Sequence, residues 1–159
     1  MKAEPNPDFM RRAIELASDN VRQGRGGPFG AVIVREGVIV GEGANSVTRT
    51  NDATAHGEIV AIRDACRRLN AFSLEGAEIY TSCEPCPMCL AAIYWAHIGR
   101  IWYGNTSADA ARIAFDDAAL YREFTLPTSE RRIPSAPLLH EQAWESFQLW
   151  LDSSKKVLY

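Results

Sequence analysis

Two short segments constrain this chain more than anything else in its sequence, because their side chains form one chemical set only if they meet in space. The first is His56-Gly57-Glu58, and the second is Pro85-Cys86-Pro87-Met88-Cys89. Cys86 and Cys89 are three positions apart, so at the start of a helix their sulfur atoms lie on the same face. Together with the imidazole of His56 they supply one nitrogen and two sulfurs, a set that suits Zn²⁺ in a tetrahedral site. The sequence therefore predicts a metal site that two separate segments build together.

The predicted ligand set is that of a catalytic zinc site. Three protein ligands leave the fourth position to water, whereas a structural zinc site usually has four protein ligands. Zinc lowers the pKa of such a water to about 7. Glu58 cannot point in the same direction as His56 on a helix, so we expect that it is not a ligand. From the first turn its carboxylate still reaches the water, where it would act as a general acid/base.

Each motif also has a more ordinary interpretation. An isolated His-x-Glu is accidental in most sequences, and Cys-x-x-Cys also occurs in redox pairs and in zinc ribbons. A ribbon needs a second Cys-x-x-Cys, and Cys83 supplies only one that overlaps at Cys86. A redox pair leaves His56 and Glu58 unexplained, so we favour catalytic zinc. Cys83 is either a packed residue at the end of a strand or a weak contact to the metal.

Composition bounds the class of protein. The chain has 159 residues, enough for one domain with a core, and its apolar content of 47% is ordinary for a globular protein. No apolar run approaches the ~20 residues that span a bilayer. The N-terminal residues lack the hydrophobic region of a signal peptide, so a cytoplasmic protein without membrane contact is the default expectation. The net charge of -3 weighs against a nucleic-acid substrate, because proteins that bind polynucleotides usually have a basic face.

Hydrophobic periodicity and turn residues predict alternating helices and strands. Helices are expected over 8–23, 55–69, 87–96, 108–114, 118–124 and 142–154. Strands are expected over 31–34, 38–44, 78–82, 100–103 and 133–139. Asp8 and Thr54 are the expected N-caps of the first two helices. Two prolines make the last strand short or place it at a sheet edge.

The predicted connections place the metal ligands at helix starts. Glu36-Gly37 predicts a hairpin turn between the first two strands. The β-α-β step from 78 to 103 predicts a parallel strand pair. His56 and Cys86 each lie at the beginning of a helix, so the positive ends of two helix dipoles would meet at the metal and favour thiolates.

Two further places in the sequence are candidates for ligand contact. The loop of residues 24–30 lacks the Gly-Lys-Ser/Thr ending of a phosphate loop and precedes a strand. It is either a simple tight loop or a close backbone approach to a ligand, with Phe29 along the wall. Asn45 comes just after a strand, and it is either a turn residue or an amide that hydrogen-bonds a base.

Over nearly its whole length the chain resembles the cytidine-deaminase-like superfamily. His56-Gly57-Glu58 and Pro85-Cys86-Pro87-Met88-Cys89 match the zinc deaminase signature of that superfamily. Within it the chain is similar to bacterial guanine deaminases. That likeness rests on residues 26–34, 81–85, 92–96 and 115–117 and on a chain ending in Tyr159. Gly57 departs from the alanine usual in the family, and residues 122–140 match least.

The resemblance implies a fold, an activity and an assembly. The fold is α/β and three-layered, with a mixed five-stranded sheet flanked by helices, in a single domain over 1–159. The activity is hydrolytic removal of the amino group from a small purine base, above all guanine, which gives xanthine and ammonia. One Zn²⁺ is expected per subunit, and the usual assembly is a homodimer.

The resemblance also implies roles for individual residues. By position, the residues in contact with the substrate are Phe29, Asn45, Ala55, His56, Trp95 and Tyr159. Glu58 would shuttle the proton, and Asp117 would approach the amine and help to protonate it. Tyr159, in a C-terminal tail, would close the active site, from the same or a partner subunit. The ordinary interpretations are a helix N-cap for Asp117 and a chain terminus without a role for Tyr159.

Other functions stay open. The same chemistry on cytosine, guanosine or tRNA adenosine is one alternative, although the acidic balance disfavours tRNA. A zinc-stabilised binding module without turnover belongs to a different class of protein. Glu58 argues against that module, because a purely structural site does not need the carboxylate.

Overall fold

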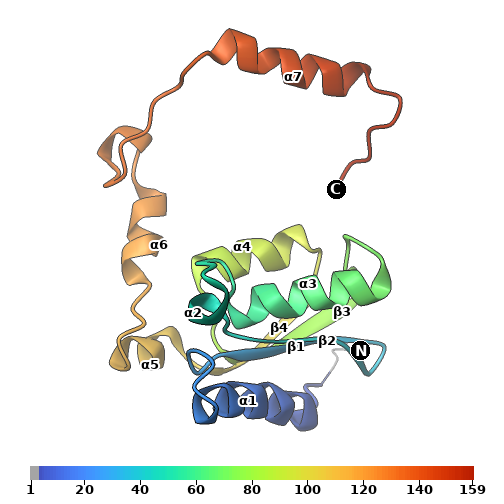
Figure 1. Ribbon diagram of the computed structural model, residues 1–159, viewed down its shortest axis with the longest axis vertical. Coiled ribbons are helices and arrows are strands. Elements are labelled where there is room, and N and C mark those ends of the chain that lie inside the picture. Colours follow the sequence, from blue (N-terminus) through green and yellow to red (C-terminus); the bar gives the residue numbers. More distant parts are fainter. Residues whose placement is uncertain (1–3) are drawn as a thin grey trace. The chain divides into compact units, whose positions relative to one another are not determined.

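A mixed sheet carries the segments of the predicted metal site (Figure 1). The computed structural model describes residues 4–159, and the chain divides into two compact units, Met1–Asp117 (unit 1) and Ala118–Tyr159 (unit 2). The strands that the described residues form are β1 (Gly30–Arg35), β2 (Val38–Ala44), β3 (Ala77–Cys83) and β4 (Arg100–Asn105). They are ordered β2-β1-β3-β4; β1 pairs antiparallel with β2 and β3, and β3 pairs parallel with β4. The predicted hairpin and the predicted parallel pair are both confirmed.

The turn of the hairpin is the one that the sequence predicted. Glu36 and Gly37 both have positive φ, at 53° and 75°, which matches a two-residue turn between twisted antiparallel strands. The register of β1 against β2 shifts between Ile33 and Val34, which leaves an extra residue in β2 as a bulge.

Helices cover both faces of the sheet (Figure 1), so unit 1 has three layers. Helix α1 (Pro7–Arg22) lies on one face, and α3 (Gly57–Leu69) and α4 (Pro87–Trp95) lie on the other. Alternating side chains of β1 supply both cores, since successive strand residues point to opposite faces. Ala31 and Ile33 pack in the cluster that includes α3 and α4, while Val32 packs with Ala13 of α1. The predicted three-layer α/β architecture is confirmed.

Helix starts differ from the expectation at two places because neighbouring side chains bind the backbone there. The N-cap of α1 is Asn6, whose Oδ1 accepts a hydrogen bond from the N–H of Asp8 at 3.0 Å. Helix α3 begins at Gly57 with His56 as its N-cap. Thr54 was the expected cap, but its N–H and hydroxyl instead donate to Asp52 Oδ1 at 2.8 and 2.6 Å.

Two short helices complete unit 1. Helix α2 (Val47–Thr50) follows β2, and α5 (Ser107–Arg112) follows β4. Thr106 and Asp109 form a capping box at the start of α5, with each side chain accepting from the backbone of the other.

Unit 2 is helical, and the predicted fifth strand is wrong. It contains α6 (Ala118–Thr125), the 3₁₀ turn η1 (Thr128–Glu130) and α7 (His140–Asp152). Residues 133–139 form no strand, so the sheet in the described part of the chain has four strands. Pro134 and Pro137 lack the N–H that strand pairing requires, which opposes a strand there. None of the described residues in α6 or α7 is buried, and residues 4–159 include no helix long and apolar enough to cross a membrane.

The first turns of α3 lie directly on β2 because β2 has glycines beneath them. A Cβ built on Gly43 would lie 2.3 Å from the carbonyl oxygen of Gly57 and 2.4 Å from the nitrogen of Ala61. A Cβ on Gly41 would lie 2.6 Å from the carbonyl oxygen of Ala61. These contacts fix the height of α3 above the sheet, and so they position His56 and Glu58.

We expect Gly43→Ala to destabilise the protein, because the added methyl group meets helix backbone that cannot move aside alone. Overpacking of this kind lowers the free energy of unfolding by about 1–3 kcal/mol. Gly99→Ala is the matched control, since its Cβ would meet only the carbonyl oxygen of Ala77, at 3.7 Å. Chemical denaturation of both variants measures the difference; equal stabilities would contradict this account of the α3–β2 contact.

Candidate metal centre

The first residue of the site, His56, is placed by the loop that enters α3. His56 is the N-cap of α3, with φ -67° and ψ 158°. Its N–H donates to the carbonyl oxygen of Thr54 at 2.8 Å, and its carbonyl oxygen accepts from the N–H of Val60 at 2.9 Å. Its imidazole therefore projects from the beginning of the helix, where the helix dipole is positive.

The two cysteines are placed in the same way by α4. Cys86 is the N-cap of α4, Pro87 is its first residue, and Cys89 is one turn further on. Proline suits the first position of a helix because it has no N–H to leave without a partner. Cys89 is fully buried and Cys86 half-buried. The two sulfur atoms thus lie on one side of the first turn of α4, as the spacing predicts.

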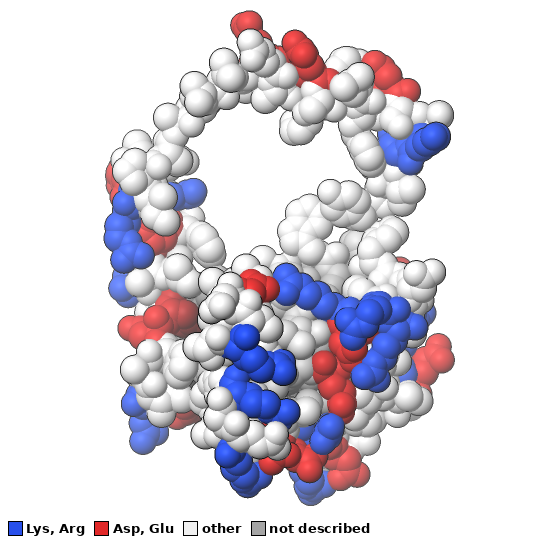
Figure 2. Space-filling model, viewed as in Figure 1, with Lys and Arg blue, Asp and Glu red and all other residues white. Residues whose placement is uncertain are grey.

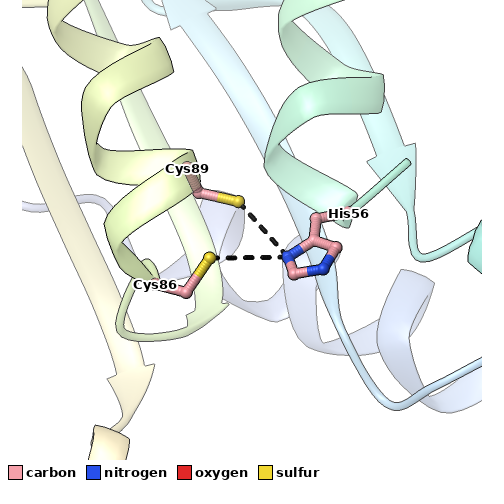
Figure 3. A group of neighbouring side chains, drawn as sticks. All are labelled: His56, Cys86 and Cys89. Carbon is pink, nitrogen blue, oxygen red and sulfur yellow. Dashed lines mark hydrogen bonds between the residues drawn. The ribbon is translucent and has the colours of Figure 1, made fainter. Parts of the chain in front are cut away.

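The three side chains form a group with the dimensions of a zinc site. Cys86 Sγ and Cys89 Sγ each lie 3.5 Å from His56 Nδ1 (Figure 3). All three ligand atoms lie within 4.8 Å of one another. In a tetrahedral site with Zn–S of about 2.3 Å and Zn–N of about 2.0 Å, sulfur and nitrogen ligands are about 3.5 Å apart. The donor set and its spacing therefore fit zinc, with His56 binding through Nδ1.

The surroundings shift the pKa values of the two thiols in opposite directions. Hydrogen bonds from Cys89 and His56 lower the pKa of Cys86 to about 4. The hydrogen bond to Cys86 and burial raise the pKa of Cys89. Metal ligands must be deprotonated, so a divalent cation would hold both sulfurs as thiolates.

Glu58 lies beside this group. It is only 6% exposed, and Cys89 Sγ donates to its Oε2 at 3.4 Å. Burial raises the pKa of the Glu58 carboxyl. It is thus a buried carboxyl group next to the predicted metal ligands, with its affinity for a proton increased.

Cys83 lies outside the three-residue group. It is the last residue of β3, and its Sγ donates to the carbonyl oxygen of Thr106 at 3.6 Å. Burial raises the pKa of the Cys83 thiol to about 11, which keeps it protonated at neutral pH. Of the two interpretations of Cys83, these contacts favour the packed residue that ends a strand.

Phe29 and Asn45 are linked through their backbones. The N–H of Asn45 donates to the carbonyl oxygen of Phe29 at 2.9 Å. The ring of Phe29 meets the ring of Phe115 edge to face, with centroids 4.9 Å apart. Phe29 also borders a cavity of about 360 Å³ that reaches Cys83. Aromatic pairs of this geometry stabilise each other's orientation.

Asp117 follows that aromatic pair in the chain. Burial raises the pKa of its carboxyl group, and the negative charge of Cys86 adds to the effect. Asp117 is therefore close enough to Cys86, one of the predicted metal ligands, for the charge of Cys86 to affect its pKa. Phe115 precedes Asp117 by two residues, and its ring contacts the ring of Phe29. The structure therefore brings the segment of Asp117 and the loop of Phe29 together.

Ala55, Trp95 and Tyr159 are placed differently. Ala55 is buried, its N–H donates to Asp52 and its carbonyl oxygen accepts from Ser46, so it joins the loop before α3 to the residue after Asn45. Trp95 is at the C-terminal end of α4, about 13 Å along the helix axis from Cys86. Tyr159 belongs to unit 2. The substrate contacts expected for these three residues stay predictions.

The sequence analysis missed three residues that hold the site in place. Asn20 and Phe115 contact the segments of Phe29 and Asn45. Ser82 accepts a hydrogen bond through its Oγ from the N–H of Gly30 at 3.0 Å. Ser82 and Phe115 lie in two of the segments that carry the likeness to guanine deaminases, but the sequence assigns neither of them a role. Asn20 is a polar residue on an amphipathic helix, where polar side chains are usually solvated.

Comparisons with known proteins agree with this geometry. The family model for the cytidine and deoxycytidylate deaminase zinc-binding region matches residues 3–105. The guanine deaminase of Bacillus subtilis (strain 168) is 48% identical over 151 residues, covering 95% of this chain and 97% of that protein. An X-ray structure of guanine deaminase from Bacillus subtilis superimposes with a TM-score of 0.94 at 46% identity, covering 98% of this chain and 99% of that one. A tRNA-specific adenosine deaminase of Aquifex aeolicus (strain VF5) is 43% identical over 93 residues, which is 58% of this chain and 61% of that protein.

We expect Cys86→Ala to abolish zinc binding, because only two protein ligands remain and metal affinity depends on the complete set. Cys83→Ala is the control, since Cys83 precedes Cys86 by three residues and its Sγ donates to the carbonyl oxygen of Thr106 instead. Metal analysis by mass spectrometry should find about one zinc per chain in the parent protein and in Cys83→Ala, and little in Cys86→Ala. Zinc retained without Cys86, or lost with Cys83, would refute the ligand set.

Proposed function

The chain belongs to the cytidine and deoxycytidylate deaminase zinc-binding family and is a zinc-dependent hydrolytic deaminase, and we propose that its substrate is guanine. Water and guanine would give xanthine and ammonia. The proposal is supported by the 48% identity to the guanine deaminase of Bacillus subtilis, which extends over 97% of that protein. The match therefore extends well beyond the two metal motifs.

The observation that carries the hydrolytic chemistry is a buried carboxyl group beside three metal-binding side chains. His56, Cys86 and Cys89 would hold the zinc ion. When bound, zinc acts as a Lewis acid that makes water a good nucleophile at neutral pH. A purely structural site gains nothing from a buried carboxyl group next to it, because burying such a group costs free energy.

In this proposal Glu58 moves the proton. It takes a proton from the attacking water and transfers it to the departing amino nitrogen. C2 of guanine thereby gains a C–O bond and loses its bond to that amino nitrogen. The burial that raises the pKa of Glu58 brings it closer to the working pH, where a group exchanges protons in both directions.

The remaining predicted residues would hold and orient the base. The ring of Phe29 offers an apolar face, and the side-chain amide of Asn45 offers a donor and an acceptor for the edge of the purine. Asp117 would accept hydrogen bonds from adjacent N–H groups of guanine and help to protonate the amine. Ala55 and His56 would line the pocket between Asn45 and the metal. The contact between Phe29 and Phe115 supports this arrangement, since it connects the segments of Phe29 and Asp117.

We also propose that the functional form is a homodimer. Each subunit would be a single deaminase domain over residues 1–159, and the C-terminal tail, which ends in Tyr159, would close an active site. Helices α6 and α7 bury none of their residues, although Phe124, Trp144 and Phe147 are apolar. The outer face of α4 exposes Tyr94 and Trp95. Apolar surfaces of this kind favour association, and Trp95 would reach a substrate from such an interface. Light scattering measures the mass of the protein in solution, and a mass equal to that of one chain would contradict the dimer.

Two observations weigh on the alternative of a tRNA substrate. Identity to tRNA-specific adenosine deaminases covers a smaller part of the chain, 58% for that of Aquifex aeolicus. On the face shown in Figure 2, Lys and Arg lie among Asp and Glu, without the single-sign surface typical of polynucleotide binding. Several arginines are paired, among them Arg12 with Glu42 at 2.7 Å. These observations favour a small purine over tRNA as the substrate. We propose that the protein acts on it in the cytoplasm.

We expect Glu58→Gln to keep its zinc and to lose turnover by a factor on the order of 10² to 10⁴, which is the usual contribution of general acid/base catalysis. The amide has the same size but cannot take up the proton. Glu75→Gln, at an exposed position, is the matched control and should behave like the parent protein. Loss of zinc from Glu58→Gln would overturn the assigned role, since it would make Glu58 a ligand.

The proposed substrate is tested by a panel of amino compounds: guanine, guanosine, adenine, cytosine and cytidine. Ammonia release, expressed as kcat/KM, should be highest for guanine, because a site that hydrogen-bonds particular N–H groups rejects compounds that lack them. A different ranking rejects guanine, and faster release from guanosine would indicate a nucleoside pocket.

A further inference from the structure

Asn20 has an unusual place for an amide side chain on an amphipathic helix. It lies near the end of α1 and is only 3% exposed. Its Nδ2 donates to the carbonyl oxygen of Gly27 at 2.9 Å and to the carbonyl oxygen of Asn45 at 2.8 Å. Both hydrogens of the amide are used, and each goes to a different segment of the chain.

The two carbonyl groups belong to the two segments that carry Phe29 and Asn45. The N–H of Asn45 donates to the carbonyl oxygen of Phe29, so the segments are also bonded directly, at 2.9 Å. The N–H of Phe29 donates to the carbonyl oxygen of Gly27, which makes that oxygen an acceptor for both Phe29 and Asn20. Asn20 therefore closes a small network around the backbone of both predicted base contacts.

The network is tightly packed. A Cβ on Gly26 would lie 2.5 Å from the carbonyl oxygen of Asn45 and 3.0 Å from Asn20 Nδ2. The loop and Asn45 are therefore so close that no side chain fits between them at Gly26, and the hydrogen bonds of Asn20 hold the two segments together. The spacing between the ring of Phe29 and the amide of Asn45 is fixed from behind.

We propose that Asn20 is a positioning residue for the purine: it sets the distance between the Phe29 ring and the Asn45 amide without touching the substrate. This inference rests on the proposed function, because it takes Phe29 and Asn45 as the residues that hold the base. Loss of the two donors leaves two buried carbonyl groups without these partners, and such groups gain by turning toward water. The loop would then shift, and the two base contacts would no longer fit one ring.

The metal ligands and Glu58 have further contacts in which Asn20 takes no part, although a Cβ on Gly57, between His56 and Glu58, would lie 3.1 Å from the carbonyl oxygen of Phe29. His56 and Glu58 are held by α3 over β2, and the cysteines are held by the first turn of α4. Removal of Asn20 should therefore weaken the binding of the base and leave the chemical step largely intact. A residue with a merely structural role would instead reduce the amount of active protein, which lowers kcat and zinc content together and leaves KM unchanged.

The test is the KM and kcat of Asn20→Leu with guanine, because leucine is similar in size and donates no hydrogen bond. We expect KM to rise about tenfold or more, the range that loss of two buried hydrogen bonds supports, with kcat within about threefold of the parent value. Zinc content should stay at the parent level. Asn20→Ser, whose short hydroxyl can donate to one carbonyl at most, should give a smaller rise in KM. If Asn20→Leu does not fold, the KM of Asn20→Ser tests the proposal instead.

The matched control is Phe9→Ala, at the other end of α1. Phe9 packs on Tyr80, with ring centroids 5.4 Å apart, so its loss loosens α1 without reaching the loop. Its melting temperature should fall at least as far as that of Asn20→Leu while KM stays within about twofold. An equal rise of KM in Phe9→Ala, an unchanged KM in both Asn20 variants, or a joint loss of kcat and zinc would overturn the proposal.

Failure of the proposed function can be told apart from failure of this inference. If the parent protein deaminates another compound of the substrate panel best, guanine is rejected as the substrate. The KM values of the parent protein, the Asn20 variants and Phe9→Ala for that compound then show whether Asn20 positions the base.

Discussion

His56 Nδ1 must lie about 3.5 Å from each of two cysteine sulfurs for zinc to bind all three, and unit 1 is arranged so that it does. His56 and Cys86 are both N-caps, so each ligand lies where a helix begins and backbone N–H groups point outward. Placing two helix starts side by side also favours the negative charge of the thiolates. The metal site therefore depends on how α3 and α4 are set on the sheet.

Small residues and hydrogen bonds from behind set those positions. Gly43 lets α3 lie against β2, so that the loop before it carries His56 toward α4. On the other side of the sheet, Asn20 of α1 reaches the backbone of Gly27 and Asn45. The metal ligands are thus held mainly by α3 and α4 on one face of the sheet, whereas Asn20 reaches the predicted base contacts from α1 on the other face. This separation explains why a change in one is expected to affect turnover and a change in the other to affect affinity.

The sequence predicted what depends on local pattern. The Cys86–Cys89 spacing, the hairpin at Glu36-Gly37 and the order of the elements as far as β4, apart from the short α2, follow from short-range rules, and the structure agrees with them. It failed at two local features and at one that depends on the fold. The N-cap of α3 moved because Asp52 binds Thr54, and the strand expected over 133–139 did not form. Asn20 could not have been identified, since its partners are carbonyl groups brought near only by the fold.

Hydrolysis requires that the protein supply only three of the four ligands of zinc, so that water can take the fourth position. X-ray absorption at the zinc edge of the purified protein measures this directly. We predict two sulfur neighbours at about 2.3 Å and two lighter neighbours at about 2.0 Å, one of them the nitrogen of His56 and the other from solvent. Three sulfur neighbours would bring Cys83 into the site and fill the position that hydrolysis needs, and that result would contradict the account.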